Sequence, residues 1–195
     1  LLQLTVLNGG SDGNVTVQLL GQTLNLQNGS GPQTYDMHPD TTAPVVAAQV
    51  SGVLGNNGYY TSDVTVTWSV TDAESAVTSS GCGTQTVQFD TTGTTFTCTA
   101  NSKGGSTTQS VTIKRDATAP TISGSRTPGA NGAGWNNSPV AVTFACNDAG
   151  SGVASCNGST TLSTDGAGQS VTGTVTDLAG NTATTTVSGI NIDST

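Results

Sequence analysis

A short motif built on Asp, Thr and Pro recurs along this chain at a nearly constant interval. It is complete at Asp40–Pro44 and at Asp116–Pro120, and its first part occurs again at Asp193–Thr195. The interval is 76 residues in the first case and 77 in the second. A period of this size indicates a tandem array of small domains. We therefore predict a β-strand segment at 1–39, full units at 40–115 and 116–192, and the start of a further unit at 193–195.

The composition of the chain excludes several classes of partner. Only 8% of the 195 residues are charged, and 12 Asp and Glu outnumber 4 Lys and Arg, for a net charge of −8. So few cations cannot neutralise a phosphate backbone, which excludes a nucleic-acid partner and disfavours an anionic membrane surface. No apolar run approaches the roughly 18 residues of a membrane span, and no signal peptide is visible. We expect no membrane insertion in this segment.

The clearest pattern in the chain alternates apolar residues with Thr or Ser, which is typical of a strand with one buried and one wet face. In the first unit this pattern predicts a core of Val64, Val66, Trp68 and Val70. In the second unit the same register recurs 76 residues later at Val140, Val142, Phe144 and Cys146. We predict an all-β fold of tandem β-sandwiches, each with five to seven short strands. Trp68 and Phe144 are expected to be the central core aromatics, and the alternation continues at Val87 and Phe89.

Residues 1–39 do not match the repeat but also alternate. Apolar residues at every second position predict strands over 2–6 and 15–19, joined as a hairpin by the polar turn at 8–13. A third strand is expected over 23–27. Three strands with one apolar face are only marginally stable as an isolated sheet. The segment is therefore expected to be the tail of a preceding β domain, or a set of strands that completes a sheet in a neighbouring subunit.

Four cysteines allow three disulfide pairings. Cys82 and Cys98 fall in the first unit, and Cys146 and Cys156 fall in the second, so we predict one disulfide inside each unit. Each closes a short loop, for which chain entropy predicts about 3 kcal/mol of stabilisation. The alternative is four buried free thiols in a cytosolic protein. An acidic, Thr-rich chain with very little Lys favours an oxidising, extracellular location instead.

Three motifs accompany the recurring Asp-Thr-Pro openings: Gly58–Val66, Asp148–Val153 and Thr176–Asn181. With them, residues 40–195 resemble the tandem bacterial immunoglobulin-like repeats of large secreted and cell-surface proteins. The resemblance implies extracellular stalks, spacers and adhesin arms, usually without catalysis. The two units differ at one loop, because Asn101–Gly105 stands in the first where the second has Asp177–Asn181.

Enzyme motifs are missing from the sequence. The one histidine is His38, and no nucleophile elbow, metal-spaced His pair or phosphate loop is found. Asp72 and Glu74 form the one close pair of carboxylates that a glycosidase could use. They lie in a predicted turn after a strand, so a solvent-facing turn is the better interpretation, and we expect no enzymatic activity.

A calcium site is the sharper possibility. Calcium takes six to eight oxygen ligands, and the recurring boundary Asp residues can face loop acids of adjoining units, where a bound ion would stiffen the joint. The candidate ligands are Asp40, Asp72, Glu74, Asp116, Asp148 and Asp177. The alternative is that each boundary Asp caps a turn by accepting from its own backbone two residues on.

Three functions remain to be compared. The first is a non-enzymatic surface or secreted structural protein, a rigid stalk or fibre whose partners are neighbouring repeats. The second is a polysaccharide-binding module attached to a secreted enzyme, with Tyr60 and Trp135 as the candidate ligand aromatics. The third is a filament subunit in which the strands of residues 1–39 add to the sheet edge of a neighbour. Retention of the protein on a glycan would indicate the second function, and self-assembly would indicate the third.

Overall fold

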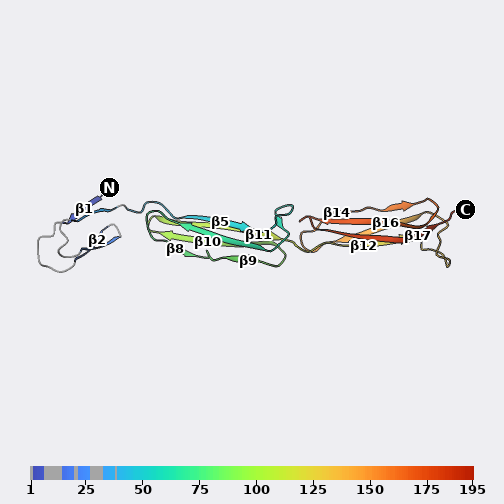
Figure 1. The fold of residues 1–195 in the computed structure, drawn as a ribbon, viewed down its shortest axis with the longest axis horizontal. Coiled ribbons are helices and arrows are strands. Elements are labelled where there is room, and N and C mark those ends of the chain that lie inside the picture. The colour runs from blue at the N-terminus through green and yellow to red at the C-terminus, as the bar shows by residue number, and fades with distance from the viewer. Residues whose placement is uncertain (1, 7–14, 20–21, 27–32, 38) are drawn as a thin grey trace. The chain divides into compact units, whose positions relative to one another are not determined.

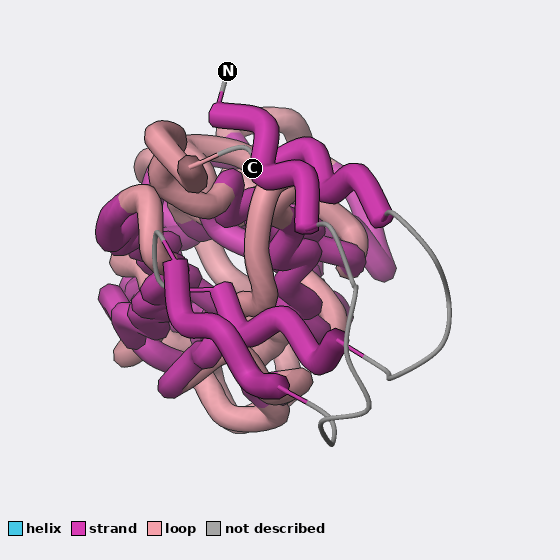
Figure 2. The backbone as a smooth tube through the Cα atoms, turned by 90° about the vertical axis from the view of Figure 1, so that its left-hand side faces the viewer, coloured by secondary structure: helices cyan, strands magenta, loops and turns pink. Residues whose placement is uncertain are grey.

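The structure, a computed structural model, describes residues 2–6, 15–19, 22–26, 33–37 and 39–195. These residues form β-strands, turns and loops and contain no helix, as Figure 2 shows by its magenta strands and pink connections. The predicted all-β fold is therefore confirmed. No helix with the length and apolar character of a membrane span occurs among the described residues.

Residues 45–115 form two antiparallel-rich sheets (Figure 1). One has the strand order β5-β7-β9, with bounds Val45–Ser51, Val64–Thr71 and Gln85–Val87. The other has the order β6-β11-β10-β8, with bounds Tyr59–Tyr60, Gly105–Arg115, Thr91–Ser102 and Thr78–Ser80. Short strand β6 runs parallel to β11, whereas β8 runs antiparallel to β10.

Residues 121–192 form two sheets with the corresponding strand order. The first is β12-β13-β15, with bounds Thr121–Thr127, Val140–Asn147 and Thr160–Leu162. The second is β14-β16-β17, with bounds Val153–Cys156, Gly166–Asp177 and Thr182–Ile192. A parallel bridge between Asn136 and Ile192 takes the place that β6 has beside β11. The two sets of strands are thus arranged as β-sandwiches of the same topology.

By its contacts the chain divides into two compact units. The first unit contains Leu1–Gln49, Thr67–Thr84 and Phe96–Val111, and the second contains Val50–Val66, Gln85–Thr95 and Thr112–Thr195. The division crosses long strands such as β10 and β11, so the compact units differ from the predicted domains. The predicted boundaries at 39/40, 115/116 and 192/193 stay predictions.

The fully buried core is aliphatic. Val64 and Val66 on β7 and Val140 and Val142 on β13 have no exposed surface, as predicted. Val140 and Val142 pack in one cluster with two isoleucines of β17, Ile190 and Ile192. Alternation along the strands places these side chains on the inner faces.

The predicted central aromatics lie at the margin of this core. Trp68, Val70 and Phe144 are each half-buried rather than buried. The reason is the length of the neighbouring strand: β9 pairs with Val64–Val66 and β15 pairs with Val140–Val142. Residues further along β7 and β13 therefore lie beyond the end of that neighbour and stay partly open to solvent.

Phe144 nevertheless spans the space between the sheets of the second unit. Its ring lies over Gly124 of β12 and Gly173 of β16, where an added Cβ would come within 3.1 Å and 2.6 Å of ring carbons. These glycines belong to opposite sheets. Because neither glycine has a side chain, there is room for the ring between the two sheets. The ring packs against the aliphatic cluster.

The continued alternation at Val87 and Phe89 is only half confirmed. Val87 is fully buried on β9, but Phe89 is 62% exposed. Since β9 ends at Val87, the backbone of Phe89 no longer follows the pleat that would turn its side chain inward.

The strand pairing of residues 2–37 differs from the predicted hairpin. Strand β1 (Leu2–Val6) pairs with β4 (Gln33–Met37), and β2 (Val15–Leu19) pairs with β3 (Gln22–Leu26). Only two residues separate β2 from β3 in the sequence, so these strands pair at a small cost in loop entropy, and β1 pairs with the later β4. The prediction of a β1–β2 hairpin is therefore wrong, and β4 was not predicted. The predicted turn at 8–13 and His38 lie outside the described residues.

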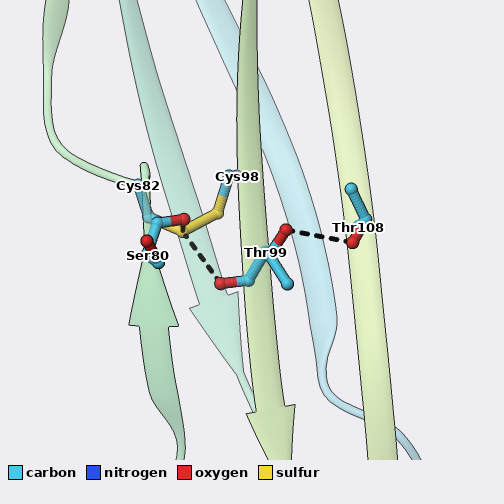
Figure 3. Close-up of a disulfide and its surroundings, with 5 residues drawn as sticks. All are labelled: Ser80, Cys82, Cys98, Thr99 and Thr108. Atoms are coloured by element: carbon cyan, nitrogen blue, oxygen red, sulfur yellow. Dashed lines mark hydrogen bonds between the residues drawn. A yellow bond between two sulfur atoms is a disulfide. The ribbon is translucent and has the colours of Figure 1, made fainter.

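Both predicted disulfides are present, but they join different kinds of neighbour. Cys82 follows β8 and is bonded to Cys98 of β10, the adjacent strand in the same sheet (Figure 3). Cys146 of β13 is bonded to Cys156 of β14, which belongs to the other sheet. The first disulfide thus links strands within a sheet, and the second links the two sheets.

Candidate functional site

The connection Asp116–Pro120 is held by the residues that precede it in the chain. The N–H of Asp116 donates to the carbonyl oxygen of Tyr60 at 2.9 Å. The next N–H, of Ala117, donates to Oδ1 of Asp90 at 2.9 Å, and the hydroxyl of Thr118 donates to Oδ2 of the same carboxylate. A single aspartate after β9 therefore fixes two successive residues of the connection.

Asp90 is itself positioned by an ion pair. Arg115, the last residue of β11, contacts Asp90 at 2.7 Å and Asp63 at 2.8 Å. Burial raises the pKa of Asp90, but hydrogen bonds from Thr118 and Ala117 and the charge of Arg115 outweigh it, so the pKa lies below its ordinary value of 3.8. The carboxylate is charged at neutral pH and available to the connection.

Residues that follow the connection hold it as well. The side-chain amide of Asn181 donates to the carbonyl oxygens of Asp116 at 3.0 Å and of Thr118 at 3.3 Å. Asp116 has no exposed surface, and Pro120 is buried. Because side chains from both directions bond to this segment, it is a fixed connection rather than a free linker.

The carboxylate of Asp116 points into the loop that follows β13. Its Oδ2 accepts the N–H of Ser151 at 2.7 Å. At Gly150 an added Cβ would lie 2.5 Å from the carboxyl carbon of Asp116. Glycine at this position is what allows the backbone of the loop to approach the buried carboxylate so closely.

Three carboxylates meet at this point. Oxygen atoms of Asp116, Asp148 and Asp177 all lie within 4.8 Å of one another. Asp116 and Asp177 are fully buried, and Asp148 is half-buried. Among the described residues, these three form a group with the spacing of metal ligands.

Main-chain amides hold the other two carboxylates of this cluster in place. Asp148 accepts from the N–H of Gly152 at 2.7 Å, and Asp177 accepts from the N–H groups of Gly180 and Asn181 at 2.7 and 2.8 Å. These donors are neutral main-chain amides. The donor set is all oxygen, and it fits a hard divalent cation such as calcium.

The remaining predicted ligands form a separate group in the first compact unit. The hydroxyl of Ser75 donates to Asp40, and the N–H of Glu74 donates to Asp72 at 2.8 Å. The Ser75 hydroxyl lowers the pKa of Asp40, and the Glu74 N–H lowers the pKa of Asp72. Glu74 in turn accepts from the N–H of Thr41 at 2.9 Å.

The structure therefore divides the six predicted ligands by predicted domain. Asp40 meets acids of residues 40–115, and Asp116 meets acids of residues 116–192. The expectation that a boundary aspartate faces the acids of an adjoining unit is wrong. The cause is the short distance along the chain: each boundary aspartate directly precedes the sandwich whose end loops it joins.

The alternative prediction of a capped turn is confirmed at all three boundaries. The N–H two residues on donates to the aspartate Oδ1 at 3.2 Å in each case, from Thr42 to Asp40, from Thr118 to Asp116 and from Thr195 to Asp193. The recurring Asp-x-Thr is thus an Asx turn. At Asp116 the turn and the carboxylate cluster use the same side chain.

The two candidate ligand aromatics have different environments. Tyr60 is half-buried, with a ring carbon 3.0 Å from the position of a Cβ added at Gly52. Trp135 is 36% exposed and follows a turn in which its N–H donates to Oδ1 of Asn131 at 3.1 Å. Of the two rings, Trp135 is the more accessible to a ligand.

A loop contact in the second compact unit was not predicted from the sequence. The N–H of Asn56 donates to the carbonyl oxygen of Ala179 at 2.8 Å, and the side-chain amide of Asn57 donates to that of Leu178 at 2.8 Å. Ala179 has no exposed surface. The sequence around Gly55–Gly58 indicates a turn, which is correct, but a turn motif carries no information about its partner.

Comparison with models of known protein families finds no match to this chain, and comparison with curated proteins finds no relative. The resemblance of residues 40–195 to bacterial immunoglobulin-like repeats therefore depends on the sequence motifs.

Proposed function

We propose that this chain is a non-enzymatic extracellular structural or adhesive module, a stalk or spacer of immunoglobulin-like repeats. The observation that carries the proposal is the fixed connection Asp116–Pro120, which bonds to Tyr60 and Asp90 before it and to Asn181 after it. A connection bonded on both sides limits bending between consecutive domains, which is what a spacer requires. The shared strand order of residues 45–115 and 121–192 supports a tandem repeat.

A secreted location agrees with the chemistry of the chain. Two disulfides persist best in an oxidising compartment. Twelve acidic residues against four basic ones give the chain a net negative charge. This charge favours solubility and repels other anionic surfaces.

Calcium belongs to the same proposal. Asp116, Asp148 and Asp177 would hold the ion, which supplies the positive charge that their neutral hydrogen-bond donors lack. Because Asp116 is also the first residue of the connection, a bound ion would tie the connection to the loops after β13 and β16. Calcium would thereby stiffen the joint from within residues 116–192.

The experiment that tests the spacer is ¹⁵N relaxation on the full chain, which gives separate rotational correlation times for residues 45–115 and 121–192. We expect one common value in the wild type, set by the two sandwiches tumbling together, and a clearly smaller value for each sandwich in the double variant Asp90→Ala, Asn181→Ala. A matched control is Asp165→Ala, since Asp165 accepts from Ser194 and not from the connection. Independent tumbling in the wild type would overturn the proposal.

Polysaccharide binding is the second candidate, and the exposed aromatic rings Trp135 and Phe89 favour it. Exposed rings stack on sugar faces, so a binding module should be retained on an insoluble glycan. Retention that is lost in Trp135→Ala but kept in Tyr60→Phe would support this function. Wild-type protein that passes through the glycan matrix without delay would dismiss it.

Strand exchange is the third candidate. Sheets β1-β4 and β2-β3 each have two strands, and a strand pair leaves outer edges on which a neighbour can add. Sedimentation of the full chain over a range of concentrations tests this assembly. A monomer at the highest concentration would exclude a filament built in this way.

A further inference from the structure

We infer that the disulfide Cys146–Cys156 positions the loop between its two cysteines at the carboxylate cluster, so that the cluster binds calcium less tightly once this bridge is open. The calcium part of this role rests on the proposed function, because it concerns regulation of the same site. The disulfide Cys82–Cys98 has no such role, and the difference follows from the residues that each bridge encloses.

The loop closed by Cys146–Cys156 supplies a carboxylate and two hydrogen bonds at the cluster. Its cysteines have a sequence separation of 10, and Asp148 lies between them. The N–H of Ser151 in the same loop donates to Oδ2 of Asp116 at 2.7 Å. The hydroxyl oxygen of Ser151 accepts the N–H of Ala179 at 3.0 Å. One short loop therefore contacts both the connection and the loop that follows β16.

Strand β14, which the loop enters, lies at the edge of its sheet and is paired with β16. All four of its residues are exposed, so no buried side chain anchors the strand. Val153 pairs with Asp177 of the cluster, but the register shifts between Val153 and Ser155, and such an irregularity interrupts the ladder of hydrogen bonds. The bond to Cys146 of β13 ties this edge strand covalently to the opposite sheet.

The affinity of a calcium site depends on how rigidly its ligands are held. Asp116 and Asp177 are fully buried, whereas Asp148 is half-buried. Asp148 is thus the ligand with most room to move, and it lies in the loop that the bridge closes. Opening the bridge gives this loop more freedom, so ordering the three carboxylates around an ion costs more conformational entropy. The expected result is a weaker site rather than a lost one.

The first sandwich offers an internal comparison. Asp72 has there the position that Asp148 has in the second sandwich. The bridge Cys82–Cys98 begins after the loop that contains Asp72, and it joins adjacent strands of one sheet (Figure 3). Among the described residues, the group of carboxylates with metal-ligand spacing belongs to the second sandwich. A bridge around the acidic loop therefore accompanies the cluster, and the other sandwich has its bridge elsewhere.

The bridge Cys146–Cys156 is also the more accessible of the two. Cys156 is exposed, whereas Cys98 has no exposed surface and Cys82 is half-buried. A thiolate of a small reductant can attack Sγ of Cys156, which forms a mixed disulfide there, breaks the bond to Cys146 and releases Cys146 as a thiolate. A second thiolate of the reductant then displaces Cys156, and the reductant leaves as a disulfide. We expect this bridge to open first.

Two double variants compare the bridges in the full chain. Cys146→Ser, Cys156→Ser opens the bridge at the cluster, and Cys82→Ser, Cys98→Ser opens the other bridge as the matched control. Calorimetric titration with calcium should give the first variant a dissociation constant at least about tenfold above that of the wild type. The control variant should keep the wild-type value, because its bridge encloses no residue of the cluster.

Amide hydrogen exchange in calcium-free buffer tests the loop without the ion. The N–H of Ser151 donates to Asp116, and Val142 lies in the fully buried core of the same sandwich. In Cys146→Ser, Cys156→Ser, exchange at Ser151 should quicken about tenfold more than exchange at Val142, whereas a general loss of stability would quicken both alike. In the control variant the ratio of the two rates should equal that of the wild type.

An unchanged ratio of the two exchange rates in Cys146→Ser, Cys156→Ser would overturn the inference, as would a calcium affinity equal to that of the wild type. Equal weakening of calcium binding in both double variants would also overturn it, since the bridges would then be general stabilisers. A wild type that binds no calcium rejects the calcium site of the proposed function. The exchange ratio then still decides whether the bridge positions the loop.

Reduction of the wild type covers the case in which Cys146→Ser, Cys156→Ser does not fold. The folded chain is treated with increasing dithiothreitol, opened cysteines are identified by alkylation and mass spectrometry, and calcium is titrated at each step. Calcium affinity should fall as Cys146–Cys156 opens and before Cys82–Cys98 opens. An affinity that falls only when Cys82–Cys98 opens would overturn the inference.

Discussion

The side-chain amide of Asn181 donates to the carbonyl oxygen of Asp116 at 3.0 Å and to Oδ2 of Asp177 at 2.8 Å. One residue therefore links the connection Asp116–Pro120 to the carboxylate cluster. Since Asp116 and Asp177 are both buried, removal of this donor leaves acceptors that water cannot easily reach.

Asn181→Ala is expected to lower the free energy of unfolding by about 1–3 kcal/mol, the cost of leaving buried acceptors unpaired. Urea denaturation followed by tryptophan fluorescence measures the change. The exposed Asn137 supplies the control, and Asn137→Ala should have a far smaller effect. Equal stabilities for the two variants would contradict the structural role of Asn181.

Acid should loosen the connection through Asp90. Its pKa in the folded chain lies below 3.8, so this carboxylate stabilises the fold above that pH and the contribution is lost as pH falls through the folded pKa. Asp90→Asn should therefore flatten the fall in stability that begins below about pH 5 and continues through the folded pKa, with some slope left from Asp40, Asp72 and Asp193. Urea midpoints at constant ionic strength across this range give the answer, and an unchanged slope would contradict it.

Gly173→Ala should destabilise the second sandwich. An added methyl would lie 2.6 Å from the ring of Phe144, and overpacking of this kind costs about 1–3 kcal/mol. Gly132→Ala is the matched control, because it adds the same group where no atom lies within 4 Å. Thermal unfolding of both variants measures the difference, and a Gly173→Ala protein as stable as the control would show that the ring can move aside.

Calcium should raise the unfolding temperature of the wild type, and a chelator should reverse the effect. Stabilisation is expected to grow by about 1.4 kcal/mol for each tenfold rise of calcium above its dissociation constant. Asp148→Asn replaces the half-buried carboxylate of the cluster and should reduce the rise in unfolding temperature that calcium causes. Asp165 is not part of the cluster, so Asp165→Asn should leave this rise unchanged. If calcium neither changes the unfolding temperature of the wild type nor gives a heat of binding by calorimetry, the cluster does not bind calcium and its carboxylates only cap turns.

The sequence was sufficient for the features that depend on local pattern. Alternation with Thr predicted that Val64, Val66, Val140 and Val142 would be buried, because a side chain at every second position faces the same way. The interval between the Asp-Thr-Pro motifs predicted both disulfide pairings. Each of these predictions needs only the residue types and their spacing.

Features that depend on the ends of neighbouring strands were not predicted. Trp68 and Phe144 continue the pattern of buried valines, yet they remain half-buried because β9 and β15 are short. The pairing of β1 with β4 depends on the pairing of β2 with β3 between them, and alternation alone does not say which strands pair. Contact between the Asn56–Asn57 turn and Leu178–Ala179 joins residues more than a hundred positions apart, and no local pattern encodes it.

The placement of the two disulfides has a mechanical consequence. Each covalent bridge removes the residues it spans from the length that the chain can release when its ends are pulled apart. The bridges span sequence separations of 16 and 10 residues, which at full extension correspond to roughly 55 Å and 35 Å of withheld contour length. Reduction would therefore make the chain a longer tether under load, in two steps of unequal size, and the larger step comes from the bridge between Cys82 and Cys98.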